Sequence, residues 1–88
     1  MAIVNNQSGR MWKTTEHGEA DLLYRIDGNV MIIYHTFTPV KDRGHGVAAE
    51  IALEAFAYAK KHNLKVKPDC PYILHFIEVH KEYASMLV

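Results

Sequence analysis

The first forty residues contain short runs of apolar and β-branched residues, separated by Gly, Asn and Asp, without a sustained helical period. These runs predict strands at residues 11–15 and 20–26, joined by a turn at residues 17–19. The dipeptide Asp27-Gly28 is typical of a tight hairpin turn. We therefore expect a small antiparallel sheet in this half of the chain.

The clearest strand pattern lies at residues 30–38, which are rich in β-branched and aromatic side chains. Its first half is almost continuously apolar, a pattern that indicates cover on both faces of a strand. Pro39 lacks an N–H group, so we expect the ladder of hydrogen bonds to end before it.

The period changes to 3.6 residues between residues 46 and 62, which predicts the principal helix. Its many alanines favour helix intrinsically and allow close packing against a sheet. The apolar positions expected to face inward are Val47, Ala48, Ile51, Ala52, Ala55, Phe56 and Ala59.

A second strand and helix are predicted after this principal helix. Asn63 is a suitable helix cap, and residues 64–67 have the pattern of a short strand. Pro71 suits the first turn of a helix over residues 71–80, with Ile73, Phe76 and Ile77 facing inward. The order of strand, helix and strand suggests a parallel crossover, and the fold class is therefore α+β with a mixed, mainly antiparallel sheet and two principal helices.

Composition narrows the class of protein. With 88 residues and 49% apolar residues, we expect one globular domain over residues 1–88. Ten basic and ten acidic side chains cancel, which argues against strong general attraction to nucleic acid or anionic membrane. The longest apolar run, residues 30–34, is far short of the roughly 20 residues of a membrane helix.

The single cysteine and the histidines restrict the chemistry further. One cysteine forms neither an internal disulfide nor a zinc knuckle, and the first ten residues lack the pattern of a signal peptide. We therefore expect a cytoplasmic protein. His75 and His80 are five residues apart, about 140° around a helix, so no metal site is expected.

The most informative segment is Arg43-Gly44-His45-Gly46-Val47-Ala48, between the best strand and the longest helix. The first amides of a helix have no partner within the helix, and together with its dipole they attract anions. Glycines allow a phosphate to approach the backbone, and Lys41 and Arg43 add positive charge. A diphosphate is the ligand that such a turn would suit, and an ordinary strand-to-helix turn without a ligand is the alternative.

Two familiar phosphate loops do not match this segment, because the Walker and Rossmann patterns both require residues that are absent here. The pattern R-x-x-G-x-A, formed by Arg43, Gly46 and Ala48, resembles the diphosphate-binding motif of the GNAT superfamily of acetyl-CoA-dependent N-acetyltransferases. The likeness extends over about residues 20–88 and looks like the very short branch of the superfamily. It includes the segments His35-Thr36-Phe37-Thr38-Pro39, Lys67-Pro68-Asp69-Cys70-Pro71-Tyr72 and His80-Lys81-Glu82-Tyr83.

The resemblance implies a GNAT-like sheet and acetyl-CoA as co-substrate. It places the pantetheine arm along Thr36, Phe37 and Thr38, with the diphosphate over residues 43–48. It further implies that this strand and the strand near residues 64–67 splay apart around the thioester. The acceptor would be an amine of unidentified structure, because the chain is too short for the helices that usually shape the acceptor site.

Cys70 and His35 are the candidate catalytic residues. Cys70 precedes a predicted helix start, where a thiolate is stabilised, and it would accept the acetyl group or line its pocket. His35 could act as a general base if it faces the same cleft. The alternatives are a buried apolar cysteine and a histidine held by cross-strand contacts.

Tyr72 and Tyr83 are possible proton donors to the departing thiolate, or simply packed aromatic residues. The lysines at 60, 61, 65 and 67 could attract the 3′-phosphate of CoA, although a solvated helix end is the simpler explanation. The sequence thus predicts an acetyl-CoA-dependent N-acetyltransferase. The alternative function is a non-catalytic acyl-CoA or nucleotide-binding module.

Overall fold

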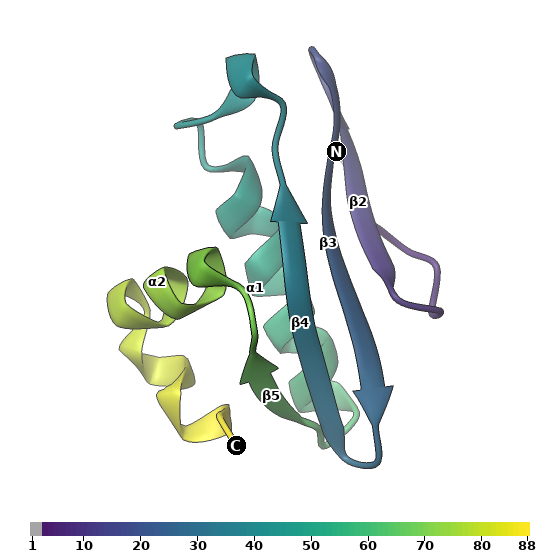
Figure 1. Ribbon diagram of the computed structural model, residues 1–88, viewed down its shortest axis with the longest axis vertical. Coiled ribbons are helices and arrows are strands. Elements are labelled where there is room, and N and C mark those ends of the chain that lie inside the picture. Colours follow the sequence, from purple (N-terminus) through teal and green to yellow (C-terminus); the bar gives the residue numbers. More distant parts are fainter. Residues whose placement is uncertain (1–2) are drawn as a thin grey trace.

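Five strands form one sheet in the order β1-β2-β3-β4-β5 (Figure 1). The structure is a computed structural model that describes residues 3–88; residues 1 and 2 of the predicted domain lie outside the described part. The first four strands pair antiparallel, whereas β4 and β5 are parallel, as predicted. The strands are β1 (Val4–Asn5), β2 (Arg10–Thr15), β3 (Gly18–Asp27), β4 (Val30–Phe37) and β5 (Lys65–Pro68).

Two α-helices lie where the sequence predicts them, one after β4 and one after β5. Helix α1 (Val47–Lys61) forms the crossover from β4 to β5, and α2 (Pro71–Val79) begins with its proline in the first turn. Two short 3-10 helices complete the chain, η1 (Val40–Asp42) before α1 and η2 (Lys81–Met86) after α2. Within residues 3–88, no helix has the length and apolar character needed to cross a membrane.

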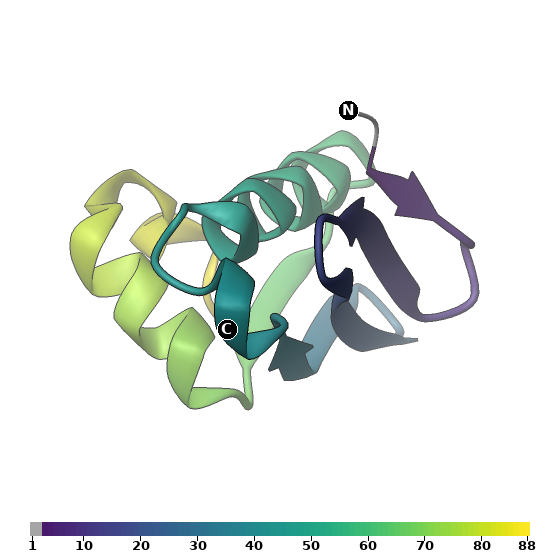
Figure 2. The same ribbon diagram turned by 90° about the horizontal axis from the view of Figure 1, so that it is seen from above.

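The core lies between one face of the sheet and the two helices (Figure 2). The predicted inward residues of α1 from Ile51 to Ala59 are buried, and Phe56 stacks on Phe76 of α2 at 5.6 Å between ring centroids. The opposite sheet face carries neither helix. The first half of β4 is nevertheless covered on both faces, as expected: Met31 and Ile33 belong to the core, and Ile32 is only 5% exposed because the register places it between Arg25 and Lys67, whose long stems flank it.

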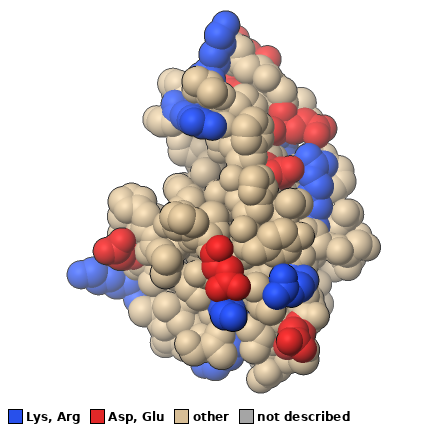
Figure 3. Space-filling model, viewed as in Figure 1, with Lys and Arg blue, Asp and Glu red and all other residues tan. Residues whose placement is uncertain are grey.

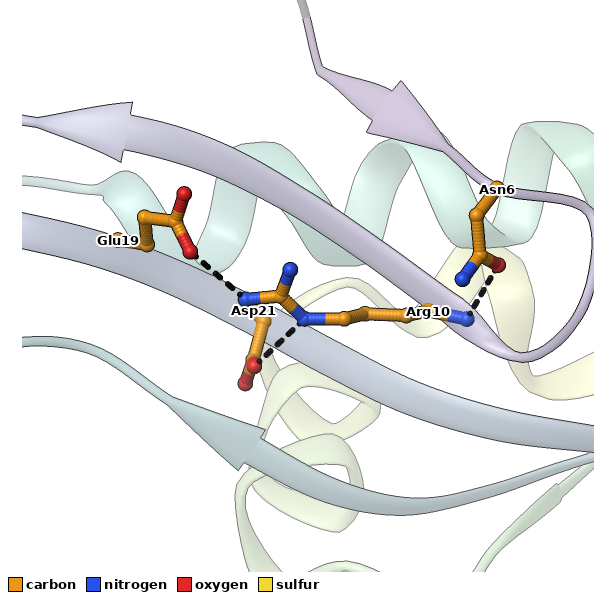
Figure 4. A network of polar contacts seen from close by, with 4 residues as sticks. All are labelled: Asn6, Arg10, Glu19 and Asp21. Atoms are coloured by element: carbon orange, nitrogen blue, oxygen red, sulfur yellow. Dashed lines mark hydrogen bonds and ion pairs between the residues drawn. The ribbon is translucent and has the colours of Figure 1, made fainter.

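The hairpin of β2 and β3 has a short turn and is held together by side-chain hydrogen bonds and ion pairs. Its turn consists of the two residues between the paired Thr15 and Gly18, so it lies slightly earlier than predicted. On the helix-free face, Arg10 donates from Nε to Asp21 at 3.1 Å and from Nη2 to Glu19 at 3.0 Å (Figure 4). The Arg10 amide also donates to Asn6 at 3.0 Å, which fixes the loop that precedes β2. These contacts stabilise the pairing of β2 with β3 and therefore the position of the turn that joins them.

A β-bulge in β4 decides which side chains reach the helix side of the sheet. Strand β3 advances one residue, from Leu23 to Tyr24, while β4 passes from His35 to Ile33, so Tyr34 is the extra residue. Beyond the bulge, Thr36 lies opposite the core residue Leu22, and His35 lies opposite Leu23. Paired residues share a face of the sheet, so Thr36 faces the helices and His35 faces away from them.

The pairing of β4 with β5 is shorter than β4 itself. It ends at Ile33 and Pro68, and the amide of Asp69 then donates to the carbonyl of Ile33 at 2.9 Å. Strand β4 continues to Phe37 beside β3 alone. All four residues of β5 pair with β4, so the splay expected from the family resemblance is not seen between the paired strands; instead β5 ends at Pro68 and the rest of β4 has no partner on that edge.

Candidate functional site

A cavity of about 520 Å³ opens where β4 ends and α1 begins. It lies on the helix side of the sheet, between the turn that carries η1 and the first turn of α2. Figure 3 shows a hollow on the left edge of the molecule between its upper end and α2. The lining residues are Thr36, Phe37, Thr38, Asp42, Arg43, Gly44, Gly46, Val47, Ala48, Ala49 and Tyr72.

The amides at the start of α1 are open to this cavity. Gly46 caps the helix with φ of 82°, and no side chain caps it. The first amide with a backbone partner is that of Glu50, which donates to the carbonyl of Gly46. For residues 44–49, no hydrogen bond from a backbone amide is found within the described residues 3–88. These amides and the helix dipole form a place for an anion.

The two glycines of the turn have a conformational role. Gly44 and Gly46 both have φ of +82°, in the left-handed region that other residues adopt at a cost. A Cβ atom at either position would meet no other atom within 4 Å, so backbone conformation, not crowding by the protein, demands glycine. The turn is therefore shaped so that its backbone faces open space.

Basic side chains lie on the same turn. The guanidinium of Arg43 donates from Nε to the carbonyl oxygen of Thr38 at 3.0 Å, which ties the turn to the end of β4. Arg43 is exposed. Blue side chains stand at the upper end of the molecule in Figure 3, where η1 lies in Figure 1, and this segment contributes Lys41 and Arg43.

Asp42 connects the turn to the β2–β3 hairpin. Its carboxylate is 8% exposed and accepts a hydrogen bond from Thr15 Oγ1 at 2.7 Å. The ring Nδ1 of His17 lies 3.1 Å from the other carboxylate oxygen and acts as the donor, since an ionised carboxylate only accepts. The bond from Thr15, assisted by that from His17, lowers the pKa of Asp42 in spite of its burial.

Cys70 lies beside the cavity at the start of α2. The thiol is 6% exposed, and its Sγ is 3.4 Å from Oγ1 of Thr36, which lines the cavity. Cys70 is the capping position of α2, but its side chain does not cap the helix; its carbonyl accepts bonds from Ile73 and Leu74. The thiol is thus directed across the gap between α2 and β4.

His35 and Cys70 lie on opposite sides of β4. The imidazole is exposed on the helix-free face, next to Leu23, because the bulge at Tyr34 changes the alternation of side chains. Cys70 contacts Thr36 on the helix side. The structure therefore does not bring these two candidates together as a direct pair.

The structure gathers most of the other predicted residues. Of the nine predicted cofactor-binding residues, eight line the cavity, and His45 is exposed outside its lining. Tyr72 lines the cavity too, and burial raises the pKa of its hydroxyl. Lys60 and Lys61 end α1, about 20 Å along its axis from Gly46, so they belong to a solvated helix end far from this turn.

Sequence reasoning did not identify Thr15, His17 or Asp42 as parts of the site. The contact of Asp42 with Thr15 spans 27 residues of sequence, and that with His17 spans 25. A single polar residue in a turn carries no signal of such a partner. Only the pairing of β2 with β3, and of β3 with β4, brings the hairpin turn to η1.

Two comparisons with known proteins bear on the family and the fold. The family model of GCN5-related N-acetyl-transferases matches residues 10–86. The fold is similar to the NMR solution structure of a proposed GCN5-like N-acetyltransferase from Staphylococcus aureus, with a TM-score of 0.73 and 21% sequence identity. That similarity covers 99% of this chain and 87% of the other chain.

Proposed function

Because the chain belongs to the GCN5-related N-acetyltransferase family, we propose that it transfers the acetyl group of acetyl-CoA to an amine. The observation that carries this proposal is the open cavity at the start of α1, which is lined by residues whose backbone amides have no hydrogen-bond partner among the described residues. The charge that a diphosphate needs is supplied there by backbone dipoles and Arg43, in a chain whose formal net charge is zero.

The cavity suggests how acetyl-CoA would lie. Its diphosphate would accept hydrogen bonds from the amides of the turn and the first turn of α1. The pantetheine arm would follow the part of β4 that has lost its partner β5, beside Thr36 and Thr38. This direction leads the thioester toward Thr36 and Cys70, beyond the point where the pairing of β4 with β5 ends.

The chemistry requires two proton movements. The amine nitrogen attacks the thioester carbonyl, a C–N bond forms and the C–S bond breaks. We assign Tyr72 as the donor of a proton to the departing CoA thiolate, since it lines the cavity and a tyrosine hydroxyl is protonated at neutral pH. We assign His35 as the base for the attacking ammonium, which would then approach from the helix-free face.

Cys70 is proposed to act at the acetyl end of the cavity. Its contact with Thr36 places the thiol beside the predicted path of pantetheine. In a covalent route, the Cys70 sulfur would attack the thioester, release CoA thiolate and then pass acetyl to the amine. In a direct route, the thiol would only line the pocket, and retention of acetyl label on Cys70 separates the two.

Binding is tested first. Acetyl-CoA or CoA at 100 times its dissociation constant is expected to stabilise the fold by about 2.7 kcal/mol, an increase in melting temperature of roughly 10–20 °C for a domain of this size. ATP serves as the control for a general nucleotide site. The absence of a shift with either CoA species at saturation would contradict the proposal.

Transfer is tested next with labelled acetyl-CoA and panels of polyamines, peptides and small amines. We expect His35→Gln to lower kcat at least tenfold with little change in CoA affinity, and the matched variant His75→Gln, on the exposed side of α2, to behave as the native chain. Binding of CoA without transfer to any acceptor would favour the alternative, a non-catalytic acyl-CoA-binding module.

A further inference from the structure

The turn proposed to hold the diphosphate depends on a part of the chain that does not touch the ligand. The turn between β4 and α1 contains two glycines in left-handed conformation, and most of its residues are exposed. Its internal bonds are few: Asp42 and Arg43 donate their amides to Pro39 and Val40, and Arg43 bonds Thr38 through its side chain. Such a segment has many alternative conformations unless something outside it fixes it.

The β2–β3 hairpin makes contact with both the start and the middle of this turn. At the start, Pro39 is buried, and a Cβ atom added to Gly18 would lie 3.5 Å from its Cγ, which is van der Waals distance. In the middle, Asp42 receives the bonds of Thr15 and His17. Asp42 is next to Arg43 and is itself in the wall of the cavity.

The hairpin is itself well anchored. Six residue pairs join β2 to β3, from Arg10 with Leu23 to Thr15 with Gly18. The bonds of Arg10 to Glu19 and Asp21 reinforce the pairing on the helix-free face (Figure 4). Asp42 therefore links the turn between β4 and α1, which has few hydrogen bonds of its own, to the well-paired β2–β3 hairpin.

We infer that Thr15, His17 and Asp42 form a clamp, in which the hairpin holds the diphosphate turn in its binding conformation. They are positioning residues, because they act on the ligand through the backbone of residues 43–46. The inference rests on the proposed function for its ligand, while the ordering of the turn is a property of the free protein. A clamp of this kind raises affinity by removing the cost of ordering the turn upon binding.

Thr15→Val tests the clamp with the least disturbance. Valine keeps the β-branched shape that suits a strand and removes only the hydroxyl that bonds Asp42. Thr14→Val is the matched control, since Thr14 is the exposed neighbour on the same strand. We expect Thr15→Val to weaken CoA binding about tenfold or more, the lower end of the effect of losing one hydrogen bond to a charged group, and Thr14→Val to leave it unchanged.

Two readouts distinguish a clamp from general loss of stability. Pantetheine lacks the diphosphate, so its affinity should be the same for the native chain and Thr15→Val. In an Asp42→Ala background, Thr15→Val should have no further effect on CoA affinity, because the partner of the hydroxyl is already gone. Equal loss of CoA and pantetheine affinity, or an undiminished effect in the Asp42→Ala background, would overturn the inference.

Amide hydrogen exchange of the free protein tests the clamp separately from the ligand. We expect the amides of Asp42 and Arg43, which donate to Pro39 and Val40, to exchange at least fivefold faster in Thr15→Val, while those of α1 after Glu50 stay at the native rate. Unchanged exchange in the turn refutes the clamp even if the native chain binds CoA. If these amides exchange faster in Thr15→Val but the native chain binds no CoA, the clamp is supported and the proposed function is rejected.

Discussion

Asp42 shows how a single residue couples the site to the stability of the fold. Its pKa is lowered below the ordinary value of 3.8, first by the bond from Thr15 and then by His17. A lowered pKa in the folded state stabilises the protein above the pKa of the unfolded chain, and this contribution is lost as the pH falls through the folded value. Acid should therefore weaken the connection between hairpin and turn.

The prediction concerns the free energy of unfolding between about pH 5 and pH 2. The native chain should lose stability more steeply over this range than Asp42→Asn, because asparagine has no proton to gain. Urea unfolding at a series of pH values measures the difference. Glu54→Gln, a change of an exposed carboxyl group on α1, is the control and should follow the native curve. Parallel curves for all three proteins would show that the contacts of Asp42 contribute nothing in solution.

Residues of the site differ in how far the sequence predicts them. Gly44 and Gly46 are predictable, because their chemistry follows from a local conformation at the junction of a strand and a helix. His35 is harder, since its face depends on one extra residue in β4: counted by strict alternation from Ile33, it would point toward the helices. Asp42 is not predictable, because its partners come from a distant hairpin.

At the scale of elements, the principal strands and helices follow from periodicity, and the short ones do not. Helix α1 lies within one residue of its predicted limits at each end, and Asn63 follows it with φ of 57°, as a cap residue should. Strand β1 has two residues and η2 is a 3-10 helix, so neither is long enough to show a period. Their positions depend on the neighbours that they pack against, β2 for the strand and α2 for η2.

The junction of η1 and α1 allows a prediction about Gly46→Ala. An alanine at φ of 82° should cost about 1–2 kcal/mol of folding free energy and should also shift the first amides of α1. Gly28→Ala is the matched control, because Gly28 has φ of +61°, open space around it and a place in the β3–β4 turn, far from the cavity.

Both variants should therefore lose similar melting temperature, roughly 4–16 °C for a domain of this size, but only Gly46→Ala should lose CoA affinity. Calorimetric unfolding and titration with CoA measure the two effects separately. Equal loss of affinity in both variants would mean that stability alone governs binding, and that the turn makes no contribution of its own.

At the scale of the whole molecule, the cavity results from one topological event. The crossover through α1 makes β5 parallel to β4, and the chain then leaves β5 for α2 while β4 continues. The space left beside β4 is bounded by the beginnings of both helices, so backbone amides, Cys70 and Tyr72 all meet around it. The helix-free face remains open beside His35, which is exposed there.

The aromatic cluster behind the cavity keeps the two helices in place. Phe56 of α1 is fully buried, stacks on Phe76 of α2 at 5.6 Å and meets Tyr83 of η2 at 4.9 Å between ring centroids. Because α2 carries Cys70 at its first turn, the position of the thiol depends on this packing. Core stability and the geometry of the site are therefore properties of the same contacts.

Phe56→Ala should remove about 3–5 kcal/mol from the free energy of unfolding, through lost burial and the cavity that remains. Since a domain of this size has on the order of 5–10 kcal/mol in total, this single change should remove roughly half of its stability. Phe56→Leu, which fills more of the space, keeps the test informative if the alanine variant does not fold. Leu53→Ala is the control on the same helix, because Leu53 is 40% exposed and should cost less than about 1 kcal/mol. If urea unfolding gave equal losses for Phe56→Ala and Leu53→Ala, the buried contact of Phe56 with α2 would contribute nothing special to the stability of the fold.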